Sequence, residues 1–270
     1  MTRTINFPII LSTHTGGRLH ESHYFQPFRT IGMPGIDYVK PENMFKEQSR
    51  IEQADLCLFP ENWQVNSLVY GLKKKIFPSI ESIHLGYNKI EMTRAMWTVC
   101  PNHVPYTLIL GSTPKTIQDV LETFPFPFVA KTTRSSMGRG VFLIQNEADF
   151  HSYATNHDVL YVQEYIESHR DLRLCLIGNK VVNSYWRESS GFKNNVAQGG
   201  VMTFTDIPQA AITLVEDVAS RLSLDHVGFD VIERSGQYYI LEFNTLFGNQ
   251  GFLAQGIRVE DFIFDHIKSL

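Results

Sequence analysis

The sequence predicts a folded protein of the mixed α/β (α+β) class, and three observations support that prediction. Short apolar runs such as residues 56–60 are bounded by Gly, Pro and charged residues, as buried strands are. Residues 209–222 instead place apolar side chains at the spacing of an amphipathic helix. Residues 228–233 and 238–244 are β-rich runs around the glycine-containing segment RSGQ, which is typical of a β-hairpin.

Strands and helices are expected to alternate along the chain. The first 85 residues, with strands at 7–11 and 56–60, are typical of a compact α/β domain. A helix is expected to follow Gly86 and to end near residue 98, and a helix at 116–124 should have its N-cap at Ser112, Thr113 or a neighbour. The other expected elements are a strand at 106–110, a strand that carries Lys131, a second strand after the loop 132–140, a helix at 148–156, and strands within 161–166 and 172–187.

Composition restricts the class of protein. A chain of 270 residues can bury a large core, in one large domain or two smaller ones. The net charge of -4 gives no overall basic footprint for nucleic acid, although local basic sites stay open. Cys57, Cys100 and Cys175 are far apart and odd in number, so we expect packing rather than disulfides. No apolar run reaches membrane-spanning length and residues 1–17 have too short an apolar core for a signal peptide, which predicts a cytoplasmic protein with no membrane partner.

Acidic and amide side chains gather in the predicted hairpin. Strand pairing would place Asp230 roughly opposite Glu242, and strand alternation puts Glu242 and Asn244 on one face. Neighbouring carboxylates repel one another and are costly to desolvate, and a hard divalent cation removes both penalties. The alternative is a solvated strand face with stray acids. The hairpin therefore predicts a site for Mg²⁺, with Mn²⁺ as a second candidate ion.

A loop of small residues, 132–140, follows the strand that carries Lys131. Its backbone N–H groups and permissive φ values suit close approach to a phosphate chain, and the lysine adds a positive point charge. The Walker, GxGxxG and protein-kinase patterns are absent. Taken alone, the loop is more often a plain hairpin and Lys131 an edge-strand lysine, but together they favour phosphate binding. The candidate contacts in the loop are Ser136, Gly138, Arg139 and Gly140.

Three histidines near the N-terminus, His14, His20 and His23, have a loose metal-like spacing. Because no fourth ligand accompanies them, we interpret them as loop histidines rather than as a zinc site. Their Gly-rich segment follows a strand end, where α/β proteins place binding loops, so it could still contact a substrate.

Five sequence blocks occur together in one order. They are Lys131 before a glycine loop, VQEYI at 162–166, RDLR at 170–173, the strip 187–200, and DVIE with LEFN in the hairpin. From about residue 87 onward the chain resembles the ATP-grasp ligases, and among them the RimK-type, glutathione-synthetase-like carboxylate-amine ligases. The resemblance implies an ATP-grasp fold in three parts, with ATP held between two antiparallel sheets. The parts are an N-terminal pre-ATP-grasp α/β domain at 1–85, a central subdomain at 86–160 and a C-terminal subdomain with the metal site at 161–270.

The resemblance also implies roles for single residues. Lys89 and Lys131 are similar to the family's lysines on the nucleotide phosphates, and residues 163–166 match the hinge whose backbone binds adenine. Asp230, Glu242 and Asn244 match the family's magnesium ligands. The nucleotide contacts that the resemblance implies are Lys89, Lys131, Ser136, Gly138, Arg139, Gly140, Gln163, Glu164, Tyr165, Ile166, Asp171, Lys193 and Asn195.

The activity implied by the resemblance is ATP-dependent formation of an amide. A carboxylate would attack the γ-phosphorus of ATP to give ADP and an acyl phosphate, and an amine would then displace phosphate. Arg173 and Arg187 would hold the carboxylate and Lys131 would offset charge on ADP, although either arginine could instead be a surface strand residue. A phosphotransferase, an acid–thiol ligase and a regulatory module without catalysis are the alternatives. The last is disfavoured because all three metal ligands are present.

Departures from the family pattern bear on the substrate. Lys193 and Asn194 stand where Arg-Ser is usual, Phe247 where proline is usual and Gln250 where Glu is common. The strip 187–200 is also less basic than a polyglutamate-accepting site would be. We therefore expect an amino acid or small peptide as substrate, with small-molecule carboxylate and amine partners. A homo-oligomer is left open.

Overall fold

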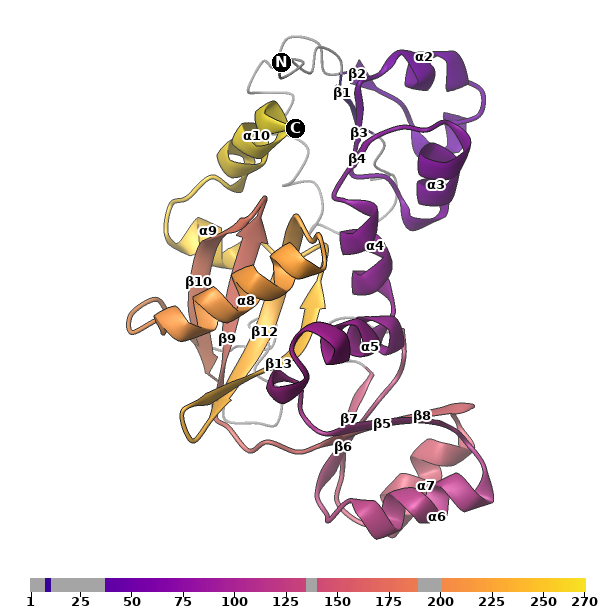
Figure 1. Cartoon of the computed structure of the whole chain (residues 1–270), viewed down its shortest axis with the longest axis vertical. Coiled ribbons are helices and arrows are strands. Elements are labelled where there is room, and N and C mark those ends of the chain that lie inside the picture. Colours follow the sequence, from indigo (N-terminus) through magenta and orange to yellow (C-terminus); the bar gives the residue numbers. More distant parts are fainter. Residues whose placement is uncertain (1–7, 11–36, 135–139, 189–200) are drawn as a thin grey trace.

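The computed structural model describes residues 8–10, 37–134, 140–188 and 201–270. Within them, three sheets follow one another along the chain, one in each of three units (Figure 1). The N-terminal unit lies at the upper right of the view, the central unit at the lower right and the C-terminal unit at the left. The predicted mixed α/β class is confirmed.

The N-terminal unit has a four-stranded parallel sheet in the order β2-β1-β3-β4. Parallel sheets are covered on both faces, which explains why the strand sequence Leu-Cys-Leu at 56–58 is apolar throughout and fully buried. All three cysteines of the chain are free and buried, as expected. The elements of the unit are β1 (Pro8–Ile10), β2 (Asp37–Tyr38), η1 (Pro41–Asn43), α2 (Gln48–Gln53), β3 (Leu56–Leu58), α3 (Asn62–Asn66), the π-helix η2 (Ser67–Gly71) and β4 (Ile76–Phe77).

Two helices, α4 (Ile80–Tyr87) and α5 (Lys89–Val99), connect this unit to the central one, where the sequence predicted a single helix. Asn88 separates them because its backbone is extended, with φ -131° and ψ 117°. Its side-chain oxygen accepts a hydrogen bond from the N–H of Ile90, which is the geometry of a helix N-cap. The second helix thus starts afresh at Lys89, in a position that the site uses.

The central unit has a four-stranded antiparallel sheet in the order β5-β8-β6-β7. Helices α6 and α7 pack on one of its faces over a core that includes Val120, Phe128 and Phe150 (Figure 1). Thr113 caps α6, as predicted, and accepts from the N–H of Thr116. The elements are η3 (Pro101–His103), β5 (Thr107–Gly111), α6 (Pro114–Thr123), β6 (Phe128–Lys131), β7 (Val141–Ile144), α7 (Glu147–Thr155) and β8 (Val159–Glu164).

The C-terminal unit has a five-stranded antiparallel sheet in the order β11-β10-β9-β12-β13. Helix α8 covers one face, where Leu172, Leu174 and Val215 belong to the largest buried cluster. Because strand side chains alternate, Asp171 and Arg173 point to the other face. The elements are β9 (Arg170–Ile177), β10 (Lys180–Glu188), β11 (Val201–Thr203), α8 (Gln209–Arg221), β12 (His226–Arg234), β13 (Gln237–Asn244), α9 (Gln250–Ala254) and α10 (Val259–Ser269).

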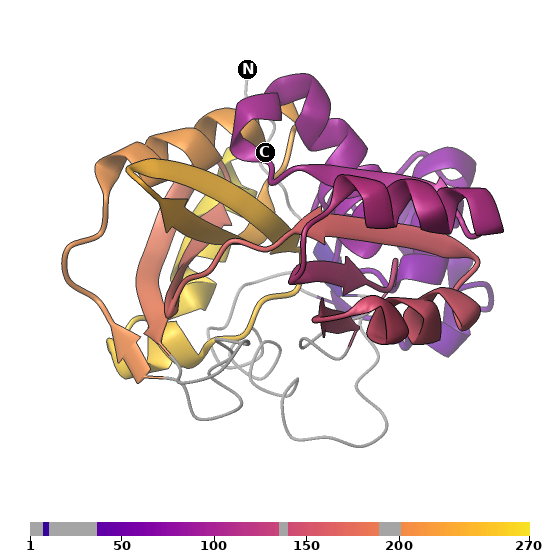
Figure 2. The same ribbon diagram turned by 90° about the horizontal axis from the view of Figure 1, so that it is seen from below.

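The three units meet around that second face. Tyr185, Phe252 and Ile263 of the C-terminal unit share a buried cluster with Leu58 and Phe77 of the N-terminal unit. Seen from below, the central unit and the C-terminal sheet lie beside each other (Figure 2). The division at residues 85 and 160 stays a prediction, and strand β8, which crosses residue 160, is hydrogen-bonded within the central sheet.

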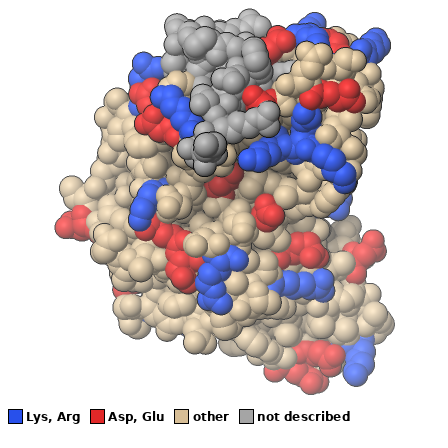
Figure 3. Space-filling view, turned by 45° about the horizontal axis from the view of Figure 1, so that its top comes forward, with Lys and Arg blue, Asp and Glu red and all other residues tan. Residues whose placement is uncertain are grey.

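The outer surface mixes charges of both signs. On the face drawn in Figure 3, groups of Lys and Arg side chains and groups of Asp and Glu side chains are interspersed among uncharged residues. Among the described helices, none has both the length and the apolar composition that a bilayer crossing would need.

Candidate active site

Two lysines, one on α5 and one on β6, lie against the C-terminal hairpin and its carboxylate Glu242. Lys89, at the start of α5, places Nζ 2.8 Å from Glu242 Oε2. Lys131, at the end of β6, places Nζ 3.4 Å from the carbonyl oxygen of Leu241. The N–H of Lys89 donates to the carbonyl of Thr133 at 3.0 Å, which fixes the helix start against the end of β6. Both lysines are more than 90% buried, so two predicted phosphate-binding cations lie together at the hairpin of the C-terminal sheet.

The pKa values of Lys131 and Glu242 are both lowered, which favours the neutral form of the lysine and the charged form of the glutamate. Burial lowers the pKa of Lys131 to about 8, although the Glu242 carboxylate favours the charged amine. Burial alone would raise the pKa of Glu242, but Lys89 and Lys131 hold it at about 2. The Glu242 carboxylate is therefore ionised across the physiological range, and the cluster keeps a negative charge next to two cationic side chains.

An irregularity in the hairpin explains the contact of Lys131. The register pairs Asp230 with Glu242, as predicted, but then pairs Val231 with Ile240, so Leu241 is an extra residue in β13. A bulged residue is left out of the hydrogen-bonded ladder. The carbonyl of Leu241 is thus available to accept from Lys131.

Two carboxylates and two arginines alternate across the neighbouring strands. Antiparallel register places Arg187 on β10 opposite Asp171 on β9, and Arg173 on β9 opposite Asp230 on β12. Arg187 donates from Nε to Asp171 at 2.6 Å and from Nη2 to Asp230 at 2.7 Å. Arg173 Nε lies 3.1 Å from Asp230, and its Nη1 donates to the carbonyl of Gly228 at 3.0 Å. Both arginines are held by protein carboxylates within the sheet, so neither is a surface strand residue.

Gly228 is required at the rear of this cluster. A Cβ atom at that position would lie 2.7 Å from Arg173 Nη1 and 2.8 Å from the Cβ of Phe247. Any side chain at residue 228 would therefore push the arginine or the loop that follows the hairpin.

The predicted metal ligands keep uncommitted oxygens. Both arginines approach Oδ1 of Asp230, and among the described residues no hydrogen bond or ion pair to its Oδ2 is present. Within the described residues, Glu242 gives Oε2 to Lys89, while its Oε1 accepts a long hydrogen bond of 3.3 Å from Asn244 Nδ2. The amide oxygen of Asn244 has no partner in the described part of the chain. Two carboxylates and one amide form a hard oxygen donor set that fits Mg²⁺ or Mn²⁺, and no third His, Cys, Asp or Glu of the described residues joins them.

The predicted adenine hinge lies where the central sheet passes to the C-terminal one. Gln163 is buried and donates to the hydroxyl of Thr107 at 2.8 Å. The Glu164 carboxylate accepts from the N–H of Tyr106 at 2.8 Å and from Arg234 at 3.0 Å, which ties the hinge to both units. Ile166 is buried and Tyr165 is half-buried. The side chains of Gln163 and Glu164 are thus used to hold the segment in place.

The glycine loop is described only at its ends. The N–H of Thr132 donates to the carbonyl of Gly140 at 2.8 Å, so the two ends of the loop are hydrogen-bonded to each other next to Lys131. Several predicted contacts lie outside the described residues. They are Ser136, Gly138, Arg139, Lys193 and Asn195, together with His14, His20 and His23 of the N-terminal segment.

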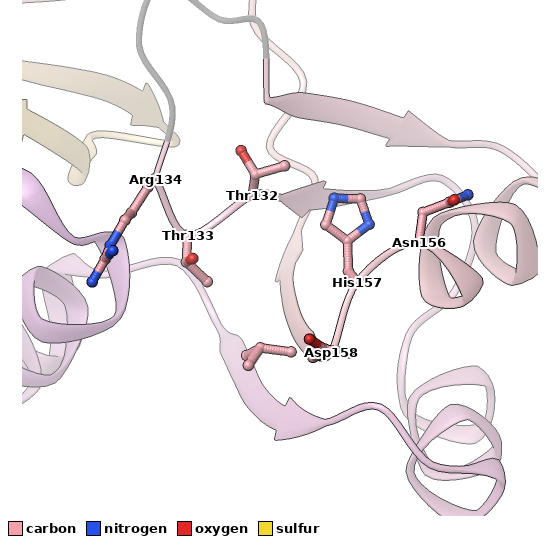
Figure 4. Close-up of a pocket in the computed structure, with 7 residues that line it drawn as sticks. Thr132, Thr133, Arg134, Asn156, His157 and Asp158 are labelled. Carbon is pink, nitrogen blue, oxygen red and sulfur yellow. The ribbon is translucent and has the colours of Figure 1, made fainter.

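A pocket of about 310 Å³ lies beside the loop, and none of the predicted site residues lines it. Figure 4 shows Thr132 and His157 near each other and Arg134 pointing away from both toward the helices. The Arg134 guanidinium stacks over the ring of Tyr87 at 5.2 Å, and the His157 ring stacks on Tyr153 at 4.2 Å. These side chains already have partners, so we do not place the chemistry in this pocket.

Sequence reasoning missed two features of the site. It did not predict the ion pair between Lys89 and Glu242, because the two residues are distant in sequence and meet only through tertiary packing. It also did not predict the ion pair of Arg187 with Asp171, whose assignment to the nucleotide site stays a prediction. Strand register could have suggested the second feature only if the bulge at residue 182 of β10 had been known.

Part of the chain is similar in sequence to known proteins. Residues 99–267 match the model of the RimK-like ATP-grasp domain family, which is more than half of the chain. Human beta-citrylglutamate synthase B is 32% identical over 165 residues, covering 56% of this chain and 42% of that protein. The coenzyme gamma-F420-2:alpha-L-glutamate ligase of Methanocaldococcus jannaschii is 28% identical over 142 residues, covering 50% of this chain and 49% of that protein. The match thus spans about half or less of the length of these curated relatives.

Solved structures of similar fold cover nearly the whole chain. The RimK domain ATP-grasp protein of Sphaerobacter thermophilus has a TM-score of 0.72 at 15% identity, with 96% of this chain and 98% of that chain covered. D-alanine–D-alanine ligase of Bacillus anthracis has a TM-score of 0.74 at 13% identity, with 97% of each chain covered. The predicted ATP-grasp fold is therefore confirmed, and the chain belongs to the RimK-like ATP-grasp family.

Proposed function

We propose that this chain is an ATP-dependent carboxylate–amine ligase that forms an amide bond through an acyl phosphate and releases ADP and phosphate. One observation supports this most strongly. Lys89, Lys131 and Glu242 meet between the two antiparallel sheets, and the Arg173–Asp230–Arg187 cluster lies on the neighbouring strands. Cations suited to a phosphate chain thus lie at β13, and cations suited to a carboxylate lie on nearby strands of the same sheet.

ATP would lie between the central and C-terminal sheets. Lys89 and Lys131 would bind its phosphates as point charges, and the backbone of residues 163–166 would bind adenine. The hydrogen bonds of Gln163 and Glu164 to the central unit support the second role, because they hold that backbone in a fixed place. Mg²⁺, or Mn²⁺ in its place, would be held by Asp230, Glu242 and Asn244 and would neutralise charge on the β- and γ-phosphates.

The first chemical step brings together two anions, the substrate carboxylate and the γ-phosphate of ATP. An oxygen of the substrate carboxylate attacks the γ-phosphorus, the bond from that phosphorus to the bridging oxygen breaks, and ADP leaves. The amine nitrogen then attacks the acyl carbon, phosphate leaves with the bond electrons, and the nitrogen loses a proton. Arg173 and Arg187 would bind the carboxylate and then the oxyanion of the tetrahedral intermediate, while Lys131 offsets charge on the departing ADP.

The substrates are expected to be amino acids or small peptides. The relatives that match are named as a beta-citrylglutamate synthase and a glutamate ligase, so glutamate is the first amine to test. The cytoplasmic location and the oligomeric state stay predictions from the sequence.

A product assay tests the proposal. The chain is incubated with ATP and Mg²⁺ over a panel that pairs small carboxylates and peptides with glutamate and other amino acids, and ADP and products are measured by mass spectrometry. We expect ADP only when both partners are present, and a product one water lighter than their sum. Lys131→Met should abolish both signals. A phosphorylated product without an amine would support a phosphotransferase, and a thioester would support an acid–thiol ligase.

A further inference from the structure

Tyr161 on β8 is among the largest fully buried side chains of the described residues, and it lies beside Lys131. Antiparallel register pairs Ala130 on β6 with Val162 on β8, so Lys131 and Tyr161 form the next opposing pair and point to the same face of the central sheet. The Lys131 ammonium lies over the Tyr161 ring, 5.7 Å from its centroid. At separations up to about 6 Å, the face of an aromatic ring attracts a cation.

The Lys131 ammonium has little else to fix its position. Its described hydrogen bond, to the carbonyl of Leu241, is long at 3.4 Å. A lysine side chain has a flexible four-carbon stem, so one long hydrogen bond leaves its head several positions. The residue is only 5% exposed, and a buried ammonium is costly unless polar or electron-rich groups surround it. The ring of Tyr161 supplies both a rigid neighbour and a favourable electrostatic contact.

Tyr161 is itself held by another element. Its hydroxyl lies 2.7 Å from the hydroxyl of Thr93, and both groups are buried. Thr93 belongs to α5 and follows Lys89 by about one helical turn. Two positions further along β8, on the same face, Gln163 donates to the hydroxyl of Thr107 at 2.8 Å. Buried side chains that are hydrogen-bonded to one another form a rigid layer, so the Tyr161 ring is fixed in place.

We propose that Tyr161 is a positioning residue, whose ring holds the Lys131 ammonium beside the hairpin, where the nucleotide phosphates would bind. The ring is covered by protein, with 1% of the residue exposed, so it acts through Lys131. The hydroxyl has a separate task, because its bond with Thr93 joins α5 to the central sheet. The inference rests on the proposed function, in which Lys131 binds phosphate.

Nucleotide binding by ring variants tests the proposal. The Kd for ADP is measured by calorimetry at saturating Mg²⁺ for the parent chain, Tyr161→Leu, Tyr161→Met and Tyr161→Phe. We expect the Leu and Met variants to raise the Kd about tenfold, and the Phe variant, which keeps the ring, to change it less than twofold. Methionine adapts to irregular space, so the result does not depend on the folding of Tyr161→Leu alone. Equal losses in all three variants, or no loss in any, would overturn the proposal.

Two comparisons separate positioning from a general loosening of the site. In the Lys131→Met background, Tyr161→Leu should change the Kd for ADP less than about twofold, because the group that the ring positions is absent. The Kd for adenosine, which lacks phosphates, should also stay the same in Tyr161→Leu. A loss of affinity that persists without Lys131, or that extends equally to adenosine, would contradict the positioning role.

Stability should follow the hydroxyl, and nucleotide affinity should follow the ring. Tyr161→Phe and Thr93→Val each break the 2.7 Å hydrogen bond and leave a buried hydroxyl without its partner, so both should lower Tm. Their combination should lower Tm by less than the sum of the two losses. The Kd for ADP should nevertheless stay near that of the parent in both single variants. An affinity that falls together with Tm in Tyr161→Phe would show a merely structural role.

Chemical labelling tests the position of Lys131 without any ligand. The parent chain and the three Tyr161 variants are treated with limiting acetic anhydride, and acetylation of each lysine is measured by peptide mass spectrometry. Lys180, whose side chain is 70% exposed, is the internal standard. Tyr161→Leu and Tyr161→Met should raise the labelling of Lys131 about threefold or more, because its flexible stem is released, whereas Tyr161→Phe should not.

The labelling also distinguishes failure of the positioning role from failure of the proposed function. A parent chain that does not bind ADP would refute the proposed function, and the labelling of free Lys131 would still decide the positioning role. Equal labelling of Lys131 in all four proteins would overturn that role, whether or not ADP binds.

Discussion

Lys89 on helix α5, which is buried, and Glu242 on strand β13, which is half-buried, form an ion pair of 2.8 Å that connects the helix entering the central unit to the C-terminal hairpin. Under the proposed function both partners have a second task, because a phosphate would compete for the lysine and a cation for the carboxylate. The free protein thus keeps each charge compensated until the nucleotide arrives.

Replacing Glu242 by Gln should reduce activity and stability together. Turnover should fall by about 100-fold or more because a charged metal ligand is lost, and the free energy of unfolding should fall by about 1–3 kcal/mol because Lys89 and Lys131 lose their counter-charge. ADP release and urea unfolding measure the two effects. The control is Glu233→Gln on the same hairpin, whose carboxylate accepts from the N–H of Gly236 in the turn. Unchanged turnover in Glu242→Gln would refute the metal assignment.

Gly86 is the point at which helix α4 touches the loop after the hairpin. A Cβ there would lie 2.2 Å from Thr245 Oγ1, so Gly86→Ala should destabilise the chain by about 1–3 kcal/mol despite the better helix propensity of alanine. Adding Thr245→Ala removes the clashing oxygen, and the next contacts are 3.3 and 3.4 Å. The double variant should therefore be more stable than Gly86→Ala alone in thermal unfolding. No recovery would mean that the clash is not the cause.

The stability of the fold should depend on His226 at mildly acidic pH. Burial lowers the pKa of His226 to about 4, and its Nδ1 bonds to the carbonyl of Thr245 at 2.7 Å. Because the folded pKa lies below the unfolded value near 6.5, the stabilisation is complete above about pH 6.5 and is lost as the pH falls toward about 4. Up to about 3 kcal/mol should be lost over this window.

Urea unfolding between pH 4 and 8 measures this loss. His226→Asn, which can keep a donor to Thr245, should flatten the pH dependence in that window. His151→Asn is the matched control, since His151 is an exposed histidine on α7, and it should leave the slope as in the parent. Equal slopes in the parent and His226→Asn would show that other groups are responsible.

The hydrogen bond between Glu164 and the N–H of Tyr106 should matter more for nucleotide binding than for stability. Glu164→Ala removes the acceptor of the Tyr106 N–H and of Arg234, so we expect the Kd for ADP to rise about 3- to 10-fold as the hinge backbone loosens. Arg234→Ala removes a partly exposed ion pair with Glu164 and the contacts of Arg234 with Tyr239, and it should change the unfolding free energy by less than about 1 kcal/mol. Calorimetry with ADP compares the Kd values of Glu164→Ala and Arg234→Ala. Equal increases in Kd would contradict a special role for the Tyr106 contact.

The sequence was sufficient to predict the hairpin because its determinants are local. A glycine-containing turn and strand alternation set Asp230 against Glu242, and the structure has that register. The same local chemistry predicted the cap at Thr113. The helix expected after Gly86 corresponds to α5, whose start is set by the cap at Asn88, whereas α4 was not predicted.

Bulges and tertiary contacts account for what the sequence did not predict. If β10 had no bulge, Arg187 would pair with Arg170 and its side chain would face α8. The extra residue at position 182 shifts the register, so Arg187 lies on the same face as Asp171 and Asp230. A bulge also exposes the carbonyl of Leu241 to Lys131. Neither irregularity has a periodic signature that a pattern of apolar residues would reveal.

The most direct test of the proposed chemistry follows the carboxylate oxygens. With a substrate pair identified by the product assay, the carboxylate is labelled with ¹⁸O and the released phosphate is analysed by mass spectrometry. An acyl phosphate predicts that each phosphate carries one ¹⁸O from the carboxylate, because that oxygen leaves with the phosphorus when the amine displaces it. Unlabelled phosphate, with amide formed at the same rate, would contradict the account.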